Sequence, residues 1–225
     1  MYDNETRRKL QNIISGVIFE EQSSHCTNAR NYLCKSFSAS TTVKKEFNYR
    51  AMLKKKQDEV LKKYADDNSL MFEKIPNGSR YIAEGGEAKI YLNIDNRTVI
   101  KINDGIYYNT WLDFLNSILI HNLLFSKTAY ELLGFIEEDT ILKAVLKQPY
   151  ITSDAEVNLL DVKKLLEFNG FENTKRNDYY NKELGLILED IHDENVITNS
   201  NTLFFIDTVF YINLVGNEIL QLPIS

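Results

Sequence analysis

The sequence has few cysteines and no long apolar run, and each shortage excludes a class of protein. Its 225 residues include two cysteines, Cys26 and Cys34, so no disulfide framework is expected. His25 stands beside Cys26, but the four ligands of a finger-like zinc site are missing. The apolar run 118–120 is broken by His121, and the first ten residues are charged and polar. We therefore expect a cytoplasmic protein that makes no membrane contact.

Charge is unevenly distributed along the chain, although the net charge is only −6. Residues 1–75 carry 14 Lys and Arg against 10 Asp and Glu, whereas residues 76–225 carry 12 against 22. The acidic second part argues against a broad nucleic-acid surface. A lysine-rich helix expected at 43–64 keeps nucleic-acid binding as a third-ranked hypothesis, because a solvated helix face explains those lysines more simply.

The hydrophobic period changes near Pro76, Asn77 and Gly78, a cluster typical of a boundary. Before it, apolar residues spaced three and four apart predict helices at 7–21, 28–37 and 43–64, with a loop at 38–42. After it, strands are predicted at 81–83, 88–94, 98–102, 132–136 and 141–146, and helices at 107–125 and 158–168. We predict a helical N-terminal extension, 1–77, and a second domain, 78–225, whose two lobes meet near residue 149.

Three oxygen-bearing side chains converge in the stretch from 188 to 207. Asp190 stands five residues before Asn195, and the apolar run that follows a polar turn at 198–201 ends in Asp207. This order predicts a loop that feeds a β-hairpin, with the three side chains at one end. Such a trio can hold Mg²⁺ and a hydroxyl group beside a phosphate. An acidic surface hairpin whose Asp and Asn cap turns is the simpler alternative.

Two upstream features could supply the other half of a nucleotide site. Gly85 and Gly86 lie at the tip of a predicted hairpin, where backbone N–H groups can approach phosphate closely. Lys101 lies on a predicted strand and shares a face with Val99, and its ammonium could neutralise phosphate oxygens. Each feature also has a plainer interpretation, an ordinary turn and a solvated lysine. His121 and the neighbouring Asn122 are interpreted as hydrogen-bonded core residues.

Taken in order, these segments resemble the protein-kinase-like fold. The run 83–91 resembles the glycine-rich loop, 98–101 the strand with the phosphate-binding lysine, and 146–150 the hinge. The run 190–207 resembles the catalytic loop and the metal-binding strand, and its wording is also similar to aminoglycoside phosphotransferases. Further short residue patterns resemble those of a small family of polyvalent protein kinases of bacterial mobile elements. These patterns lie at residues 84–87, 111–113, 121–122, 134–135 and 148–150.

The resemblance implies an α+β protein, with a five-stranded antiparallel N-lobe sheet plus helix, a reduced C-lobe and the helical extension. It implies ATP and Mg²⁺ as cofactors, with Asp190 as the base and Asn195 and Asp207 as metal ligands. Asp113 is expected to orient Lys101 in the catalytic site. The residues implied in binding the nucleotide are Gly85, Gly86, Glu87, Ala88, Lys101, Gln148 and Tyr150.

The sequence also departs from the kinase pattern. Leu188 and Glu189 replace the His and Arg before the catalytic Asp, Thr208 follows Asp207, and 18 residues remain after Asp207. We therefore expect no large helical lobe of the kind that seats protein substrates. The expected function is therefore an ATP- and Mg²⁺-dependent phosphotransferase with an unspecified acceptor or protein partner. A non-catalytic nucleotide-binding or interaction module is the alternative.

Overall fold

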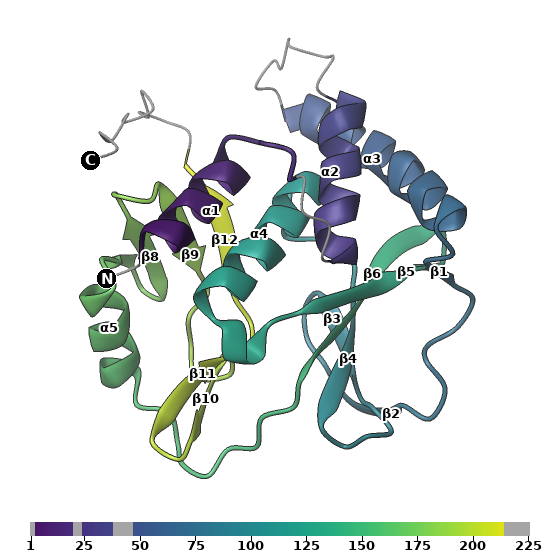
Figure 1. Ribbon diagram of the computed structural model, residues 1–225. Helices are drawn as coiled ribbons and strands as arrows, with labels where there is room; N and C mark the ends of the chain where they lie inside the picture. The colour runs from purple at the N-terminus through teal and green to yellow at the C-terminus, as the bar shows by residue number, and fades with distance from the viewer. Residues whose placement is uncertain (1–2, 20–23, 38–46, 214–225) are drawn as a thin grey trace.

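The computed structural model describes residues 3–19, 24–37 and 47–213, and it places two β-sheets on either side of helix α4 (Trp111–Leu124) (Figure 1). The predicted loop 38–42, the expected helix start at 43 and the expected helix end at 20–21 lie outside the described residues. Within the described ranges, no helix is long and apolar enough to cross a bilayer.

The larger sheet has six strands in the order β1-β5-β6-β4-β3-β2. Its strands are β1 (Met71–Phe72), β2 (Arg80–Glu84), β3 (Ala88–Leu92), β4 (Thr98–Asn103), β5 (Glu131–Glu138) and β6 (Ile141–Pro149). Neighbouring strands are antiparallel except β1, which runs parallel to β5. The expectation of five strands is therefore corrected, because a short segment before Pro76 adds a sixth.

Three helices precede this sheet: α1 (Asn4–Ile14), α2 (His25–Phe37) and α3 (Phe47–Asp67). Asp3 caps α1 by accepting the Thr6 N–H at 2.7 Å. The helix expected from residue 7 differs from α1 at its start, and within the described residues it does not continue from 15 to 19. Helix α1 starts earlier because of this cap, and it ends at Ile14 because Gly16 adopts a left-handed φ of 70°.

Helices α2 and α3 pack against α4 and the larger sheet in one hydrophobic core, as their apolar faces predict. That core includes Leu33 of α2, Leu61 of α3, Trp111 of α4 and Phe135 of β5. Helices α2 and α3 are thus bound to the lobe that carries Lys101. The domain boundary at residue 77 stays a prediction.

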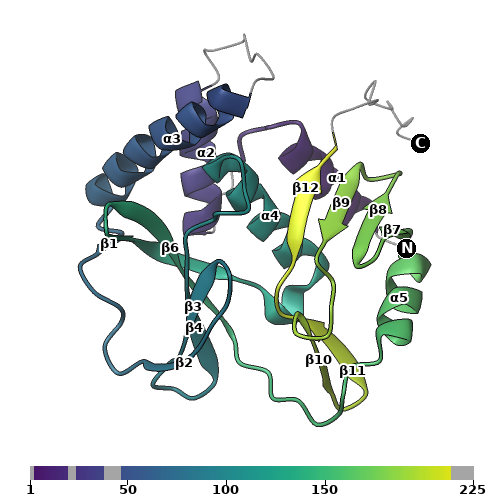
Figure 2. The ribbon, with the colours of Figure 1, turned by 180° about the vertical axis from the view of Figure 1, so that it is seen from behind.

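The second sheet is formed by four short strands in the order β12-β9-β8-β7. They are β7 (Glu172–Lys175), β8 (Asp178–Asn181), β9 (Leu186–Glu189) and β12 (Val209–Ile212). Helix α5 (Leu159–Phe168) lies at their outer edge, and a separate hairpin joins β10 (Val196–Asn199) to β11 (Thr202–Phe205) (Figures 1 and 2). The hairpin after Asn195 is therefore confirmed, whereas β7, β8 and β12 were not predicted.

Helix α4 belongs to both lobes and sets the position of the site. Its Leu115 packs in the core of the larger sheet, and its Ile120 packs in the core of the second sheet. On β4, Ile100 and Ile102 face a third cluster on the far side of the sheet. Because side chains alternate along a strand, Lys101 points the other way, toward α4 and the second lobe.

Candidate active site

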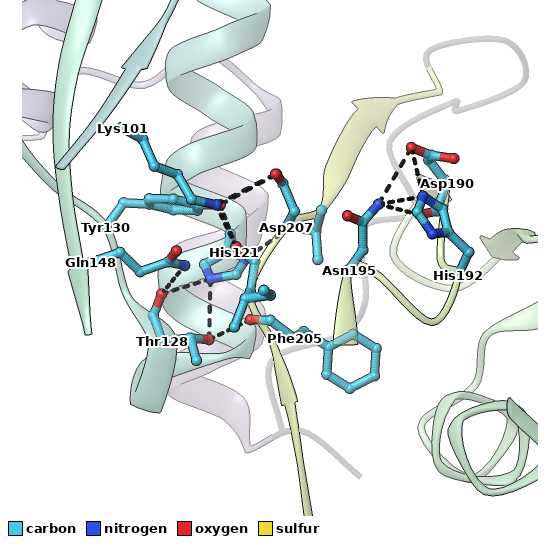
Figure 3. A network of polar contacts seen from close by, with 12 residues as sticks. Lys101, His121, Thr128, Tyr130, Gln148, Asp190, His192, Asn195, Phe205 and Asp207 are labelled. Atoms are coloured by element: carbon cyan, nitrogen blue, oxygen red, sulfur yellow. Dashed lines mark hydrogen bonds and ion pairs between the residues drawn. The ribbon is translucent and has the colours of Figure 1, made fainter. Parts of the chain in front are cut away.

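Lys101 carries the ammonium at the centre of the site, and it is only 4% exposed. Its Nζ lies 2.9 Å from the Ile206 carbonyl oxygen, 3.4 Å from Asp207 Oδ2 and 3.4 Å from the Tyr130 hydroxyl (Figure 3). The Tyr130 hydroxyl donates to the same Ile206 carbonyl at 2.8 Å. The strand predicted to carry a phosphate-binding lysine thus delivers that lysine to the predicted metal-binding Asp.

The loop before β10 and the segment after β11 are joined through the backbone of Asn195. Its carbonyl accepts the N–H groups of Ile206, at 3.0 Å, and Asp207, at 3.3 Å. Its side-chain Nδ2 donates to the Asp190 carbonyl at 2.8 Å and to Asp190 Oδ2 at 3.3 Å. The structure therefore brings Asp190, Asn195 and Asp207 together, as the hairpin pattern predicts.

The orientation of the Asn195 amide leaves its oxygen available to a cation. The Asp190 carbonyl can only accept a hydrogen bond, so the amide nitrogen faces Asp190 and the oxygen faces away. In Figure 3 this oxygen points toward Asp207. Among the described residues, no cluster of three or more His, Cys, Asp or Glu could hold a metal ion. Two oxygen ligands still fit Mg²⁺, which usually keeps water and phosphate ligands.

Asp190 adopts a left-handed backbone conformation, with φ of 63°. Its N–H donates to Asp178 Oδ1 at 3.2 Å, and the next N–H, of Ile191, donates to the Asn177 carbonyl at 3.0 Å. These contacts with the turn that leads into β8 hold the loop, while the Asp190 side chain stays 63% exposed. An exposed carboxylate on a fixed backbone is suited to receive a proton from a substrate hydroxyl.

The glycine hairpin lies next to the loop that follows β4. A Cβ built on Gly86 would stand 2.3 Å from the Tyr107 hydroxyl, so only glycine fits without a shift of that side chain, whereas Gly85 faces open space. The Gly85 N–H closes the turn on the Ala88 carbonyl at 2.9 Å. Ala88 itself is buried, and the tip remains open to a ligand at Gly85.

Glu87, directly after this turn, points into the interior and not toward solvent. It lines a cavity of about 20 Å³ together with Lys101, Asn103 and Asp207. Burial, reinforced by the negative charge of Asp207, raises the pKa of Glu87 to about 7, while Asn103 and Lys101 act in the opposite direction. This environment is unlike the solvent-open position of Gly85, although sequence reasoning placed both residues in one nucleotide-binding set.

Asp113 is not the partner of Lys101, contrary to the expectation. It lies in the first turn of α4, where its Oδ2 accepts the Thr110 hydroxyl at 2.7 Å and its N–H donates to Thr110 Oγ1 at 3.1 Å. This reciprocal capping occupies the side chain at the helix start. The ion pair of Lys101 is made with Asp207 at 3.4 Å.

The predicted hinge residues have a structural role in the sheet. Gln148 is buried, and its side chain donates to the Thr128 carbonyl at 2.7 Å. The Tyr150 N–H donates to the Arg97 carbonyl at 2.8 Å, so this backbone donor is already satisfied. The Tyr150 side chain is 41% exposed. Binding of adenine by this segment stays a prediction. The Gln148 side chain is already bonded to the Thr128 carbonyl, so it is not placed to contact a ligand.

Sequence reasoning gave no role to three residues that contact the site. The Tyr130 hydroxyl accepts a hydrogen bond from Lys101 Nζ at 3.4 Å. His192 Nε2 lies 3.5 Å from Asp190 Oδ2 and 3.1 Å from Asn195 Nδ2. Thr208 bonds His121. His192 stands inside the motif around Asp190, which was a usable signal. Tyr130 and Thr208 had none, because their contacts join segments far apart in the sequence.

Four features together define a kinase-like fold. They are the glycine hairpin between β2 and β3, the buried lysine on β4, the helix shared by two lobes and the Asp/Asn/Asp loop. A family described as "Serine/Threonine/Tyrosine Kinase found in polyvalent proteins" matches residues 54–214. The chain belongs to this family, and the match begins within α3. No curated protein matches the chain.

Proposed function

We propose that the chain is an ATP- and Mg²⁺-dependent phosphotransferase. The observation that carries the proposal is the convergence of Lys101 with Asp207, Asn195 and Asp190, which come from two lobes on either side of α4. Membership of a kinase family supports nucleotide and metal use in general.

Each side chain then has a chemical role. The open backbone at Gly85 and Gly86 approaches the phosphates, and Lys101 neutralises phosphate oxygens. Asn195 and Asp207 would hold Mg²⁺, which supplies positive charge against the phosphate oxygens. Asp190 accepts the proton of the acceptor hydroxyl. Catalysis in such a site consists mainly of positioning and charge stabilisation.

The acceptor is a hydroxyl group whose carrier the site does not name. An assay of ATP consumption over peptide and small-molecule acceptors tests the proposal, with Asp207→Asn as the comparison variant. We expect consumption to require Mg²⁺ and to fall at least about 100-fold in the variant, because a metal ligand is lost. Consumption that is equal in both proteins would refute the proposal.

A thermal shift with Mg²⁺ and ATP distinguishes the alternative, a non-catalytic nucleotide-binding or interaction module. Stabilisation of the wild type without turnover over the whole acceptor panel would identify a nucleotide-binding module that has lost catalysis. A chain with neither stabilisation nor turnover would retain the fold alone. These outcomes rest on binding to the folded state, which raises the melting temperature as the ligand concentration exceeds the Kd.

A further inference from the structure

We propose that Glu87, at the base of the glycine hairpin, is the carboxylate that positions Lys101, the task that Asp113 of helix α4 was expected to perform. The inference deepens the proposed function and rests on it, since it concerns how the same nucleotide site is assembled. It assigns Glu87 a positioning role on the lysine and not a direct contact with substrate.

Helix α4 offers Lys101 no carboxylate. The cavity beside Lys101 is lined from α4 by Phe114, Ser117, Ile118 and His121, which are apolar or neutral hydrogen-bonding side chains. His121 is fully buried, and burial lowers its pKa to about 4, so the ring is uncharged near neutral pH. Among the described residues, Glu87 and Asp207 are the acidic side chains that line this cavity.

Glu87 has one carboxylate oxygen to spare. Its Oε2 is buried and has no hydrogen-bond partner within the described part of the chain. Its backbone is held in place, since the Asp104 N–H donates to the Glu87 backbone carbonyl at 3.2 Å, and Asn103 lines the same cavity as its side chain. A buried carboxylate oxygen without a partner is costly, and a cation facing the same cavity is the group that offsets the cost.

The two charged side chains line one small cavity. The cavity that Glu87 and Lys101 share measures about 20 Å³, which is about the space of one water molecule. In this structure Lys101 makes its ion pair with Asp207, at the long distance of 3.4 Å. Asp207 is the proposed metal ligand, so its oxygens are needed elsewhere during phosphoryl transfer. When the Asp207 oxygens are engaged by the metal, Glu87 still supplies Lys101 with a counter-charge.

The position of Glu87 also joins two parts of the nucleotide site. It follows Gly86 directly, so any pull between its carboxylate and Lys101 draws the glycine hairpin toward β4. Closing the hairpin and orienting the lysine become one event. Loss of the carboxylate should therefore weaken nucleotide binding through the hairpin as well as through the lysine.

A stability cycle tests the pairing without any nucleotide. Melting temperatures are measured for Lys101→Met, Glu87→Gln and the double variant, with Asp113→Asn combined with Lys101→Met as the rival pair. We expect the double variant with Glu87→Gln to deviate from additivity by about 2 °C or more, and the rival pair to be additive. Additivity at Glu87, or coupling at Asp113 instead, would overturn the inference.

The kinetic arm compares Glu87→Gln with Glu172→Gln, the same change on the exposed strand β7 of the second sheet. For Glu87→Gln we expect KM for ATP to rise about tenfold with a smaller fall in kcat, and for Glu172→Gln a change within about twofold. Equal KM values for the two variants would refute positioning. A wild type that consumes no ATP would defeat the proposed function, and the stability cycle would still decide the Glu87–Lys101 pairing.

Discussion

His121 Nδ1 lies 2.7 Å from Thr208 Oγ1, so the shared helix α4 is bonded to the residue that follows the proposed metal ligand Asp207. The other ring nitrogen, Nε2, lies 3.0 Å from the Thr128 carbonyl, which can only accept. Nε2 therefore carries the proton, and Nδ1 accepts from the Thr208 hydroxyl. Thr128 in turn donates to the Phe205 carbonyl at 2.6 Å, so the neutral ring joins α4 to both ends of the segment around Asp207.

This buried histidine predicts loss of stability in acid. Burial lowers the folded pKa of His121 to about 4, below its unfolded value of about 6.5. Between these values the unfolded chain binds a proton that the folded chain does not. His121 thus contributes stability above about pH 6.5, and about 3 kcal/mol of it is lost as the pH falls to about 4.

Urea unfolding of the wild type and of His121→Gln, at several pH values, measures this contribution. Glu87 acts in the opposite direction between about 4.5 and 7, since its pKa is raised, so the difference between the two proteins isolates the histidine. The variant should be less stable at pH 7.5 and should lose less stability in acid. The exposed His25, changed to Asn, is the control for the loss of a histidine outside the core. Parallel curves for wild type and His121→Gln would contradict the prediction.

Gly134 predicts a second stability effect, at the bulge of β5. A Cβ there would lie 2.1 Å from the Leu70 carbonyl oxygen, which accepts the Phe135 N–H at 2.8 Å. Backbone cannot move aside as a long side chain can, so Gly134→Ala should cost about 2–4 kcal/mol. Thermal unfolding measures the cost. Gly85→Ala is the control, because nothing lies within 4 Å of its Cβ, and an equal loss in both variants would show the steric argument to be wrong.

Local sequence patterns predicted the order of most elements. They also predicted that Lys101, Asp190, Asn195 and Asp207 lie in one site. Strand alternation gives the face of Lys101, and turn residues give the hairpin after Asn195. These features depend on near neighbours in the sequence. The family model covers the same region independently, from residue 54 to 214.

Features that depend on distant contacts were missed. Asp113 was assigned to Lys101 because it lies in the helix after the lysine strand. The rotation of α4 instead directs the Asp113 side chain to Thr110, at the start of the helix. The same rotation, which no sequence period specifies, brings His121 to Thr208. Glu87 was assigned to the nucleotide-binding set with Gly85 and Gly86, and only the packing of the hairpin on β4 shows its side chain to be internal.

Arg30 predicts that the N-terminal helices stabilise the kinase-like lobe. It is fully buried on α2, and its donors bond Asn116 Oδ1 of α4 at 3.0 Å and the Ile13 carbonyl of α1 at 3.1 Å. Arg30→Met keeps much of the volume but removes these bonds, so we expect a loss of about 2–4 kcal/mol, reduced by relief of the buried charge. Urea unfolding against Arg80→Met, an exposed arginine on β2, measures the difference. Equal stability of the two variants would mean that the helices are dispensable.

Asp190→Asn separates the proposed chemistry from the fold. Asn tolerates a left-handed φ of 63° as well as Asp does, and the side chain is 63% exposed, so the melting temperature should change by less than about 2 °C. The amide cannot accept the hydroxyl proton, so ATP consumption should fall at least about 100-fold. Asp193→Asn, in the same loop and 73% exposed, is the matched control and should keep turnover within about twofold. Retained turnover in Asp190→Asn would assign the proton transfer to another group, whereas a fall of several degrees in melting temperature would show that the Asp190 carboxylate holds the loop itself.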